Sequence, residues 1–208
     1  MKILFFLFLF LFAGTLCSLA QDARLDSLIN AENAYLKEDD KHLAMLSEIN
    51  QQLLRTDPQQ CIIYCYKTIS LALKLNNRKV VADTYNTLGN SFFPLGMSDS
   101  SIAAFNKSLA SYEIIHDSAG MGNMYNNLGN AYLMGLSDFS NAANYLRKAI
   151  SIQEAIGRKD LLIFPNKNLG ITYTLLGDYR NAQAALMKSA EYAETYNRKN
   201  ILPGIYME

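Results

Sequence analysis

The sequence predicts an all-α fold, an α-solenoid of stacked antiparallel helix pairs, and two recurring landmarks predict it. The first is a Leu-Gly pair that returns at steps of 40 and 41 residues, with its glycines at Gly89, Gly129 and Gly170. The second is a lysine that returns at steps of 40, 41 and 40 residues, at Lys67, Lys107, Lys148 and Lys188. A period of this length is typical of stacked supersecondary units, none of which can bury its apolar face alone.

Each unit is interpreted as a leading helix followed by a trailing helix. The leading helix carries Leu-Gly near its middle. Because a glycine inside a helix costs about 1 kcal/mol relative to alanine, its return at one phase implies a packing reason, the close approach of the trailing helix. The small residue expected opposite the glycine is Cys61, Ser101, Ala142 or Ala182. Four residues later, on the same helical face, comes a bulkier apolar side chain, which is Cys65, Phe105, Leu146 or Leu186.

Residues 21–208 are interpreted as one array, which turn and cap signals divide into repeats. Asp57 before Pro58 predicts a helix start, as do Asp138 and Asp178 in later units. The resulting repeats span approximately 40–76, 78–117, 119–157 and 159–197, and the Gly-rich segment 120–123 is interpreted as a turn between repeats. Residues 200–208 are interpreted as the start of a further, truncated repeat. An amphipathic helix over 22–37 is expected to cap the first repeat with Leu25, Leu28, Ile29, Ala34 and Leu36.

Residues 1–20 have the layout of a secretory signal peptide. Lys2 precedes an apolar run from Ile3 to Phe12, and Ser18 and Ala20 supply small residues before the expected cleavage after Ala20. The run is short for a membrane span, although an uncleaved signal anchor is the competing interpretation. The sequence thus predicts an exported protein, periplasmic or in the cell envelope.

Composition excludes a nucleic-acid partner. Without Lys2 the chain has 18 basic and 19 acidic side chains, a net charge of −1, and no clustered basic surface. Cys61 and Cys65 remain after cleavage and share one helical face. Because both fall on core positions of the repeat, they are predicted to be buried thiols, with a strained disulfide or a redox role as the alternative.

The repeat pattern resembles the tetratricopeptide repeat: an aromatic residue, two residues, Leu-Gly, two residues and Tyr, followed by Ala, three residues and Phe or Leu. The resemblance covers roughly residues 40–208. The usual unit has about 34 residues and ends in a proline. Here each unit is about six residues longer, and Glu113, Glu154 and Glu194 stand near the proline position. This departure is similar to the long repeats of kinesin light chains and bacterial sensor proteins.

The resemblance implies a right-handed superhelix whose inner groove is lined by the leading helices. Positions three before and one after the glycine would then face the groove, and they are Asn86, Asn90, Asn126, Asn130, Lys167 and Ile171. Amide side chains both donate and accept hydrogen bonds, so such a row suits the backbone of an extended peptide. The competing interpretation is that the asparagines bond to neighbouring helices or to water. Asp83 and Asn123 are candidates to extend the surface, whereas packing between repeats is favoured for Phe93 and Leu133.

The sequence offers no catalytic residues, no metal site and no cofactor motif. His42 and His116 are far apart, and neither has a partner at triad or metal-ligand spacing. The acidic run Glu38–Asp40 is interpreted as a solvated linker.

Three functions follow as hypotheses, in this order. The first is a non-catalytic exported module that binds a protein or peptide in its groove, as the input part of a membrane-associated signalling protein tethered by its leader or by a C-terminal part beyond residue 208. The second is a structural envelope scaffold that assembles without a peptide ligand. An enzyme comes last, because the groove holds few ionisable groups.

Overall fold

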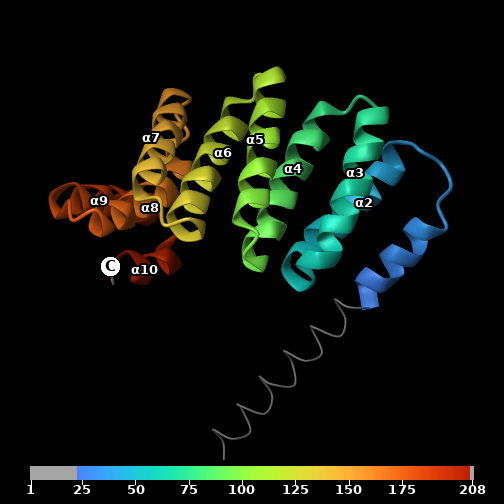
Figure 1. Cartoon of the computed structure of the whole chain (residues 1–208), viewed down its shortest axis with the longest axis horizontal. Helices are drawn as coiled ribbons and strands as arrows, with labels where there is room; N and C mark the ends of the chain where they lie inside the picture. The colour runs from blue at the N-terminus through green and yellow to red at the C-terminus, as the bar shows by residue number, and fades with distance from the viewer. Residues whose placement is uncertain (1–22, 207–208) are drawn as a thin grey trace, which may run out of the picture.

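The structure is a computed structural model that describes residues 23–206 and shows an array of helix pairs (Figure 1). No residue between 23 and 206 lies in a strand, and consecutive helices pack against one another along the chain. The predicted all-α solenoid is therefore confirmed. The expected signal peptide, residues 1–20, lies outside the described residues.

Four helix pairs follow one another in chain order. The first is α2 (Asp40–Thr56) with α3 (Pro58–Lys74), and the second is α4 (Arg78–Phe92), continued by the 3₁₀ turn η1 (Phe93–Leu95), with α5 (Ser98–Ile114). The third is α6 (Ser118–Asn130), continued by the π-helical turn η2 (Ala131–Gly135), with α7 (Phe139–Ala155). The fourth is η3 (Lys159–Leu162) and α8 (Ile163–Leu175) with α9 (Tyr179–Thr195), after which come η4 (Lys199–Ile201) and α10 (Pro203–Tyr206).

The stack bends toward its leading helices. Contacts join α2 to α4 and α6 to α8, whereas successive trailing helices α3, α5, α7 and α9 have no comparable contact in the described array. The leading helices consequently line the inner surface of the arc, as the resemblance implied.

Glycine on the leading helix makes room for the trailing helix in three of the four units. A Cβ atom on Gly129 would lie 2.6 Å from Leu146 Cγ, and one on Gly170 would lie 2.6 Å from Leu186 Cγ. Ser101 also occupies the expected place opposite the glycine, since its hydroxyl donates to the Gly89 carbonyl over 2.8 Å. The packing reason predicted for the Leu-Gly landmark is thus confirmed, although the glycine lies in the C-terminal half of its helix.

In the first unit, the large and the small side chain of this contact are exchanged between the two helices. Ile49 stands at the glycine position and Cys65 at the position of the bulky residue, and both are fully buried in one cluster. Cys61 and Cys65 are free thiols in that core, so the predicted burial is confirmed.

The one longer step of the repeat, 41 residues instead of 40, has a structural location. Eighteen residues separate Gly89 from Lys107, but 19 separate Gly129 from Lys148. The π-helical turn η2 lies between the second pair, and a π turn accommodates one extra residue without ending the helix.

Two sequence expectations were wrong in detail. Residues 120–123 form no turn but lie inside α6, where Gly120 faces the Tyr112 ring and Asp117 caps the helix by accepting from the Gly120 N–H. The first described helix ends at residue 33 rather than at 37, so Ala34 and Leu36 lie beyond it, and Leu36 is 93% exposed. Leu25, Leu28 and Ile29 do pack on the first unit.

The interpretation of Asp39 as part of a solvated linker is incomplete. Its carboxylate accepts from the His42 backbone N–H over 3.0 Å and from the Tyr35 hydroxyl over 2.9 Å, and thereby caps α2.

Candidate functional site

A ladder of asparagine side chains crosses the inner surface from α4 to α8. The amides of Asn90 and Asn127 both donate to Asn86 Oδ1, over 3.1 and 2.9 Å. Asn126 then donates to Asn127, and Asn168 donates to Asn126 over 3.5 Å. The ladder is half-exposed and connects three successive leading helices.

Sequence reasoning found Asn86, Asn90 and Asn126 but missed Asn127 and Asn168. The missed pair stands two residues before the glycine, one position further along the same helices, where Thr87 stands in the second unit. The competing interpretation, that the asparagines bond to neighbouring helices, therefore holds for Asn127 with Asn86 and for Asn168 with Asn126. Asn86 Oδ1 already accepts two hydrogen bonds. The half-exposed Asn86 side chain is therefore left with its amide N–H groups as donors.

The remaining predicted groove residues are less closely connected. Asn130 is half-exposed and forms no side-chain hydrogen bond within residues 23–206. Lys167 Nζ lies 3.0 Å from the place that a Cβ on Gly204 would occupy, so α10 lies over this lysine. Ile171 is half-exposed on α8. Leu133 is buried and Phe93 packs against the core beneath it, as favoured from the sequence.

The junction between the second and third units holds a charged network beside the ladder. The Tyr112 hydroxyl donates to Asp83 over 2.5 Å, and Lys79 pairs with Asp83 and with Asp117 at 3.1 and 2.9 Å. The lysine ammonium also lies over the Tyr112 ring, 4.7 Å from its centroid.

The network shifts three pKa values. Burial, followed by the hydrogen bond to Asp83, raises the pKa of Tyr112 far above its usual value. The backbone N–H of Gly120 is the main cause that lowers the pKa of Asp117, with a further contribution from Lys79. Burial acts to lower the pKa of Lys79, but its hydrogen bonds to Asp117 and Asp83 outweigh this and raise it. All three groups are held in their pH 7 charge states, which suits a structural network better than proton transfer.

A pocket of about 150 Å³ lies at the next junction on the same surface. Its lining combines amide, apolar and charged side chains: Asn123, Asn126, Gln153, Asp160, Leu161, Ile163, Phe164, Pro165 and Arg198. Gln153 is buried and donates to Asn123 Oδ1 over 3.4 Å, whereas its own Oε1 has no hydrogen-bond partner in the described structure. Gln153 and Phe164 are further residues that sequence reasoning missed.

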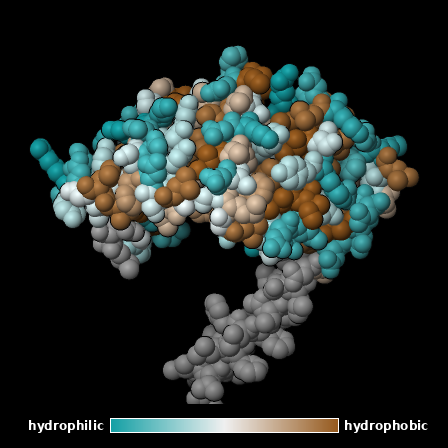
Figure 2. Space-filling view, viewed as in Figure 1, coloured by the Kyte–Doolittle hydropathy of each residue, from teal (hydrophilic) through white to brown (hydrophobic). Residues whose placement is uncertain are grey.

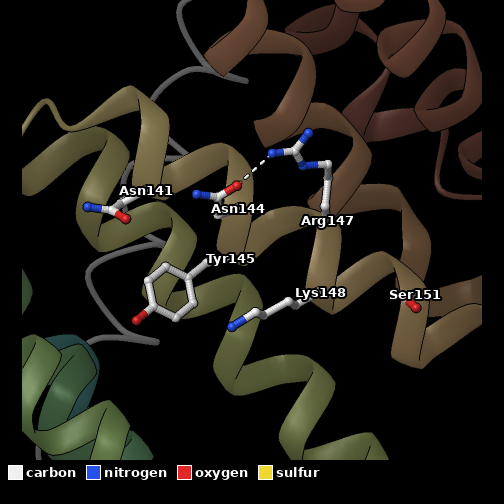
Figure 3. Close-up of a pocket in the computed structure, with 6 residues that line it drawn as sticks. All are labelled: Asn141, Asn144, Tyr145, Arg147, Lys148 and Ser151. Carbon is white, nitrogen blue, oxygen red and sulfur yellow. Dashed lines mark hydrogen bonds between the residues drawn. The ribbon is translucent and has the colours of Figure 1, made fainter.

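A second, shallower pocket follows the outer face of α7 (Figure 3). Arg147 donates to Asn144 over 2.6 Å, and the Lys148 amine extends toward the Tyr145 ring, 5.5 Å from its centroid. Lys148 lies at the same distance from the Tyr125 centroid, as Lys107 does from that of Tyr85. The recurring lysine landmark thus covers a leading-helix tyrosine in two units, which gives it a packing role.

Apolar side chains are also exposed where the leading helix turns into the trailing helix in the second, third and fourth units. They are Leu95, Met97, Met134, Leu136, Leu175, Leu176 and Tyr179. On the face seen in Figure 2, apolar and polar side chains are interspersed over the array.

Among residues 23–206, no three His, Cys, Asp or Glu side chains gather in a way that could hold a metal ion. His42 contacts Glu32 over 3.1 Å, and His116 occupies a left-handed turn after α5. Over the same part of the chain, no helix is long and apolar enough to cross a membrane.

Solved structures with the same fold include a phosphatase and a Rap protein. An aspartyl phosphate phosphatase F from Bacillus subtilis aligns with a TM-score of 0.77 at 15% identity, over 86% of this chain and 50% of that one. A Rap protein in complex with Competence and Sporulation Factor aligns with a TM-score of 0.76 at 14% identity, over 91% and 54%. The chain therefore spans about half the length of these neighbours.

A third neighbour is a signal transduction ATPase from Pyrococcus horikoshii with a tetratricopeptide repeat sensor. It aligns with a TM-score of 0.76 at 19% identity, over 89% of this chain and 28% of that one. No curated protein matches the sequence.

The family model for the tetratricopeptide repeat matches residues 80–155 and 120–195, which together cover more than half of the chain. Proteins of this family bind other proteins or peptides. The chain belongs to the tetratricopeptide repeat family.

Proposed function

We propose that this chain is a non-catalytic, exported binding module that holds an extended peptide segment of a partner protein along its inner surface. The asparagine ladder carries the proposal. Its amides project from three successive leading helices at neighbouring positions of the repeat, and an extended peptide presents carbonyl and N–H groups at a regular spacing that such a row can pair with. Bonds within the ladder hold the amides in place, which lowers the entropy lost on binding.

The signalling context is a further part of the proposal. A leader peptide, a capping helix and repeats of about 40 residues are similar to the input part of membrane-associated signalling proteins of the long-repeat branch. Among the neighbours, one is a signal transduction ATPase with a tetratricopeptide repeat sensor, and another is a Rap protein in complex with Competence and Sporulation Factor. The proposal places the module in the periplasm or cell envelope, tethered to the membrane.

The binding test starts from defined ligands. Peptides selected from a displayed random library on the wild-type array are measured by fluorescence anisotropy against Asn86→Ala/Asn126→Ala. We expect this variant to bind at least tenfold more weakly, which corresponds to about 1.4 kcal/mol. The matched control is Asn106→Ala/Asn144→Ala, which removes two exposed amides from the outer helices α5 and α7.

Thermal unfolding separates binding from folding. The inner variant also breaks ladder bonds and is expected to lose a few degrees of Tm, since a hydrogen bond contributes about 1 kcal/mol. Equal peptide affinity in the wild type and the inner variant would remove the ladder from ligand binding and with it this proposal.

An alternative function is a scaffold that assembles without a peptide ligand. The exposed apolar residues of the turns, among them Leu136 and Leu176, favour it, because burial of exposed apolar side chains drives association. Sedimentation at micromolar concentration distinguishes the two functions: the scaffold self-associates without ligand, and the binding module stays monomeric.

A further inference from the structure

The pocket at Gln153 lies at a place where the preceding junction between units holds a side chain of the protein itself. Counting along the repeat, Gln153 of α7 corresponds to Tyr112 of α5, and Asn123 of α6 corresponds to Asp83 of α4. The hydrogen bonds correspond as well: Tyr112 donates to Asp83, and Gln153 donates to Asn123. The two junctions are thus versions of one arrangement.

The two junctions differ in the side chains that lie at the inner surface. At the earlier junction the Tyr112 ring packs over Gly120, whose missing side chain makes room for it. At the later junction a glutamine has replaced the tyrosine, Leu161 stands in place of the glycine, and the pocket of about 150 Å³ opens beside them. At the earlier junction the fold itself therefore places a ring that carries a hydroxyl, the side chain of Tyr112.

The walls of the pocket specify the chemistry of an occupant. Phe164 is 53% exposed and offers a ring face, and the half-buried Leu161 supplies apolar surface. Gln153 is 1% exposed, and its Oε1 is an acceptor without a partner in the described structure, so a group that donates to it is favoured over one that cannot. The Asp160 carboxylate in the lining is already paired with Arg158 over 2.7 Å, so Arg198 at the pocket disfavours a cationic side chain.

We propose that this pocket receives the side chain of a tyrosine, whose ring stacks on Phe164 and whose phenol O–H donates to Gln153 Oε1. The tyrosine belongs to the segment bound along the ladder, so the inference rests on the proposed function and adds an anchor residue to it. Asn126 belongs both to the ladder and to the pocket lining, which makes the two parts of the surface continuous.

The experiment uses the isolated side chain, so that it does not depend on any peptide. p-Cresol, the side chain of tyrosine, is titrated into isotope-labelled protein, and the shifts of the side-chain amides of Gln153 and Asn123 are followed by NMR. Toluene, which has the ring without the hydroxyl, is titrated in parallel. We expect p-cresol to bind with a dissociation constant on the order of 1 mM, as suits so few atoms, and toluene at least fivefold more weakly.

Two variants and a control assign the effect. Phe164→Ala, on an exposed side chain, is expected to weaken p-cresol binding at least fivefold. Gln153→Leu, which keeps the volume and removes the acceptor, is expected to abolish the preference for p-cresol over toluene. Asn144→Ala on the outer face of α7 is expected to leave both titrations unchanged.

The outcomes separate the inference from the function on which it rests. Equal binding of p-cresol and toluene by the wild-type protein, or shifts confined to residues away from the pocket, would overturn the tyrosine site while leaving peptide binding by the ladder intact. Binding of p-cresol by a protein that selects no peptide would instead count against the proposed function. Should Gln153→Leu prove unfolded, the comparison of the two probes on the wild type still decides.

Discussion

Gly89 and Phe105 compete for one space between the helices of the second unit. A Cβ atom on Gly89 would lie 2.5 Å from Cε1 of the Phe105 ring, which is far inside van der Waals contact. The corresponding pair in the first unit, Ile49 and Cys65, places the large side chain on the leading helix instead. One large and one small residue therefore meet at each of these contacts, and which helix carries the large one is exchangeable.

Gly89→Ala is accordingly expected to destabilise the array by about 2 kcal/mol, because overpacking outweighs the better helix propensity of alanine. Urea unfolding followed by circular dichroism measures the change. The control is Gly122→Ala in α6, where the new Cβ would lie 3.0 Å from Cγ of Gln153, a much smaller overlap than the one at Gly89. A loss at Gly122 as large as that at Gly89 would contradict the argument from close approach.

Phe105→Cys provides a second test of the same contact. Alone it is expected to cost about 3 kcal/mol through the cavity that it leaves. In the Gly89→Ala background it is expected to cost at least about 1 kcal/mol less, because the alanine methyl occupies part of that cavity. Strict additivity in the double-mutant cycle would show that the two positions do not share space.

Deleting Met134 is expected to leave the fold intact. The residue is 66% exposed within the π turn η2, and its removal restores the regular spacing of 18 residues between Gly129 and the following lysine. Circular dichroism and thermal unfolding are expected to show unchanged helix content and a stability within about 1 kcal/mol of the wild type. Deletion of Asn126, in the regular part of α6, is the comparison and is expected to abolish cooperative unfolding of the array.

Met97→Asp is expected to stabilise the protein by about 1 kcal/mol, the usual contribution of an N-cap. Three of the four trailing helices begin after an aspartate whose carboxylate accepts a backbone N–H, at Asp57, Asp138 and Asp178. Met97 holds the same place before α5 and makes no side-chain cap. Chemical denaturation compares Met97→Asp with Met97→Leu, and an equal gain in both variants would refute capping as the cause.

Asp117→Asn is expected to reduce the loss of stability in acid. Hydrogen bonding to Gly120 and the ion pair with Lys79 hold the folded pKa of Asp117 below its usual value near 3.8. Its contribution is therefore complete above that value and disappears as the pH falls through the lower, folded pKa. Asparagine keeps the cap but not the charge, so the variant should be less stable at pH 7 by about 0.5 kcal/mol and equal to the wild type at the acid end.

Urea midpoints measured from neutral pH down to acid distinguish this expectation from a purely structural effect. If the wild type and Asp117→Asn keep a constant separation over the whole range, the ion pair makes no pH-dependent contribution.

The sequence by itself determined the repeat, the helix pairs and the location of the cores. The reason is local: glycine, aspartate and apolar residues recur at spacings that fix helix starts, faces and close contacts within each unit, as Gly129 with Leu146 and Asp138 before α7 show. It also determined three members of the asparagine ladder, since their phase relative to the glycine places them on one helix face.

Only the tertiary structure decided how neighbouring units meet. The bond from Asn127 to Asn86 spans 41 residues, and the pocket at Gln153 combines side chains from α6, α7, α8 and the segment beyond α9. Likewise, a Gly-rich stretch that resembles a turn became part of α6 because Tyr112 of the preceding helix covers Gly120. Such contacts depend on the distance and angle between stacked helices, which the spacing of residues along one helix does not contain.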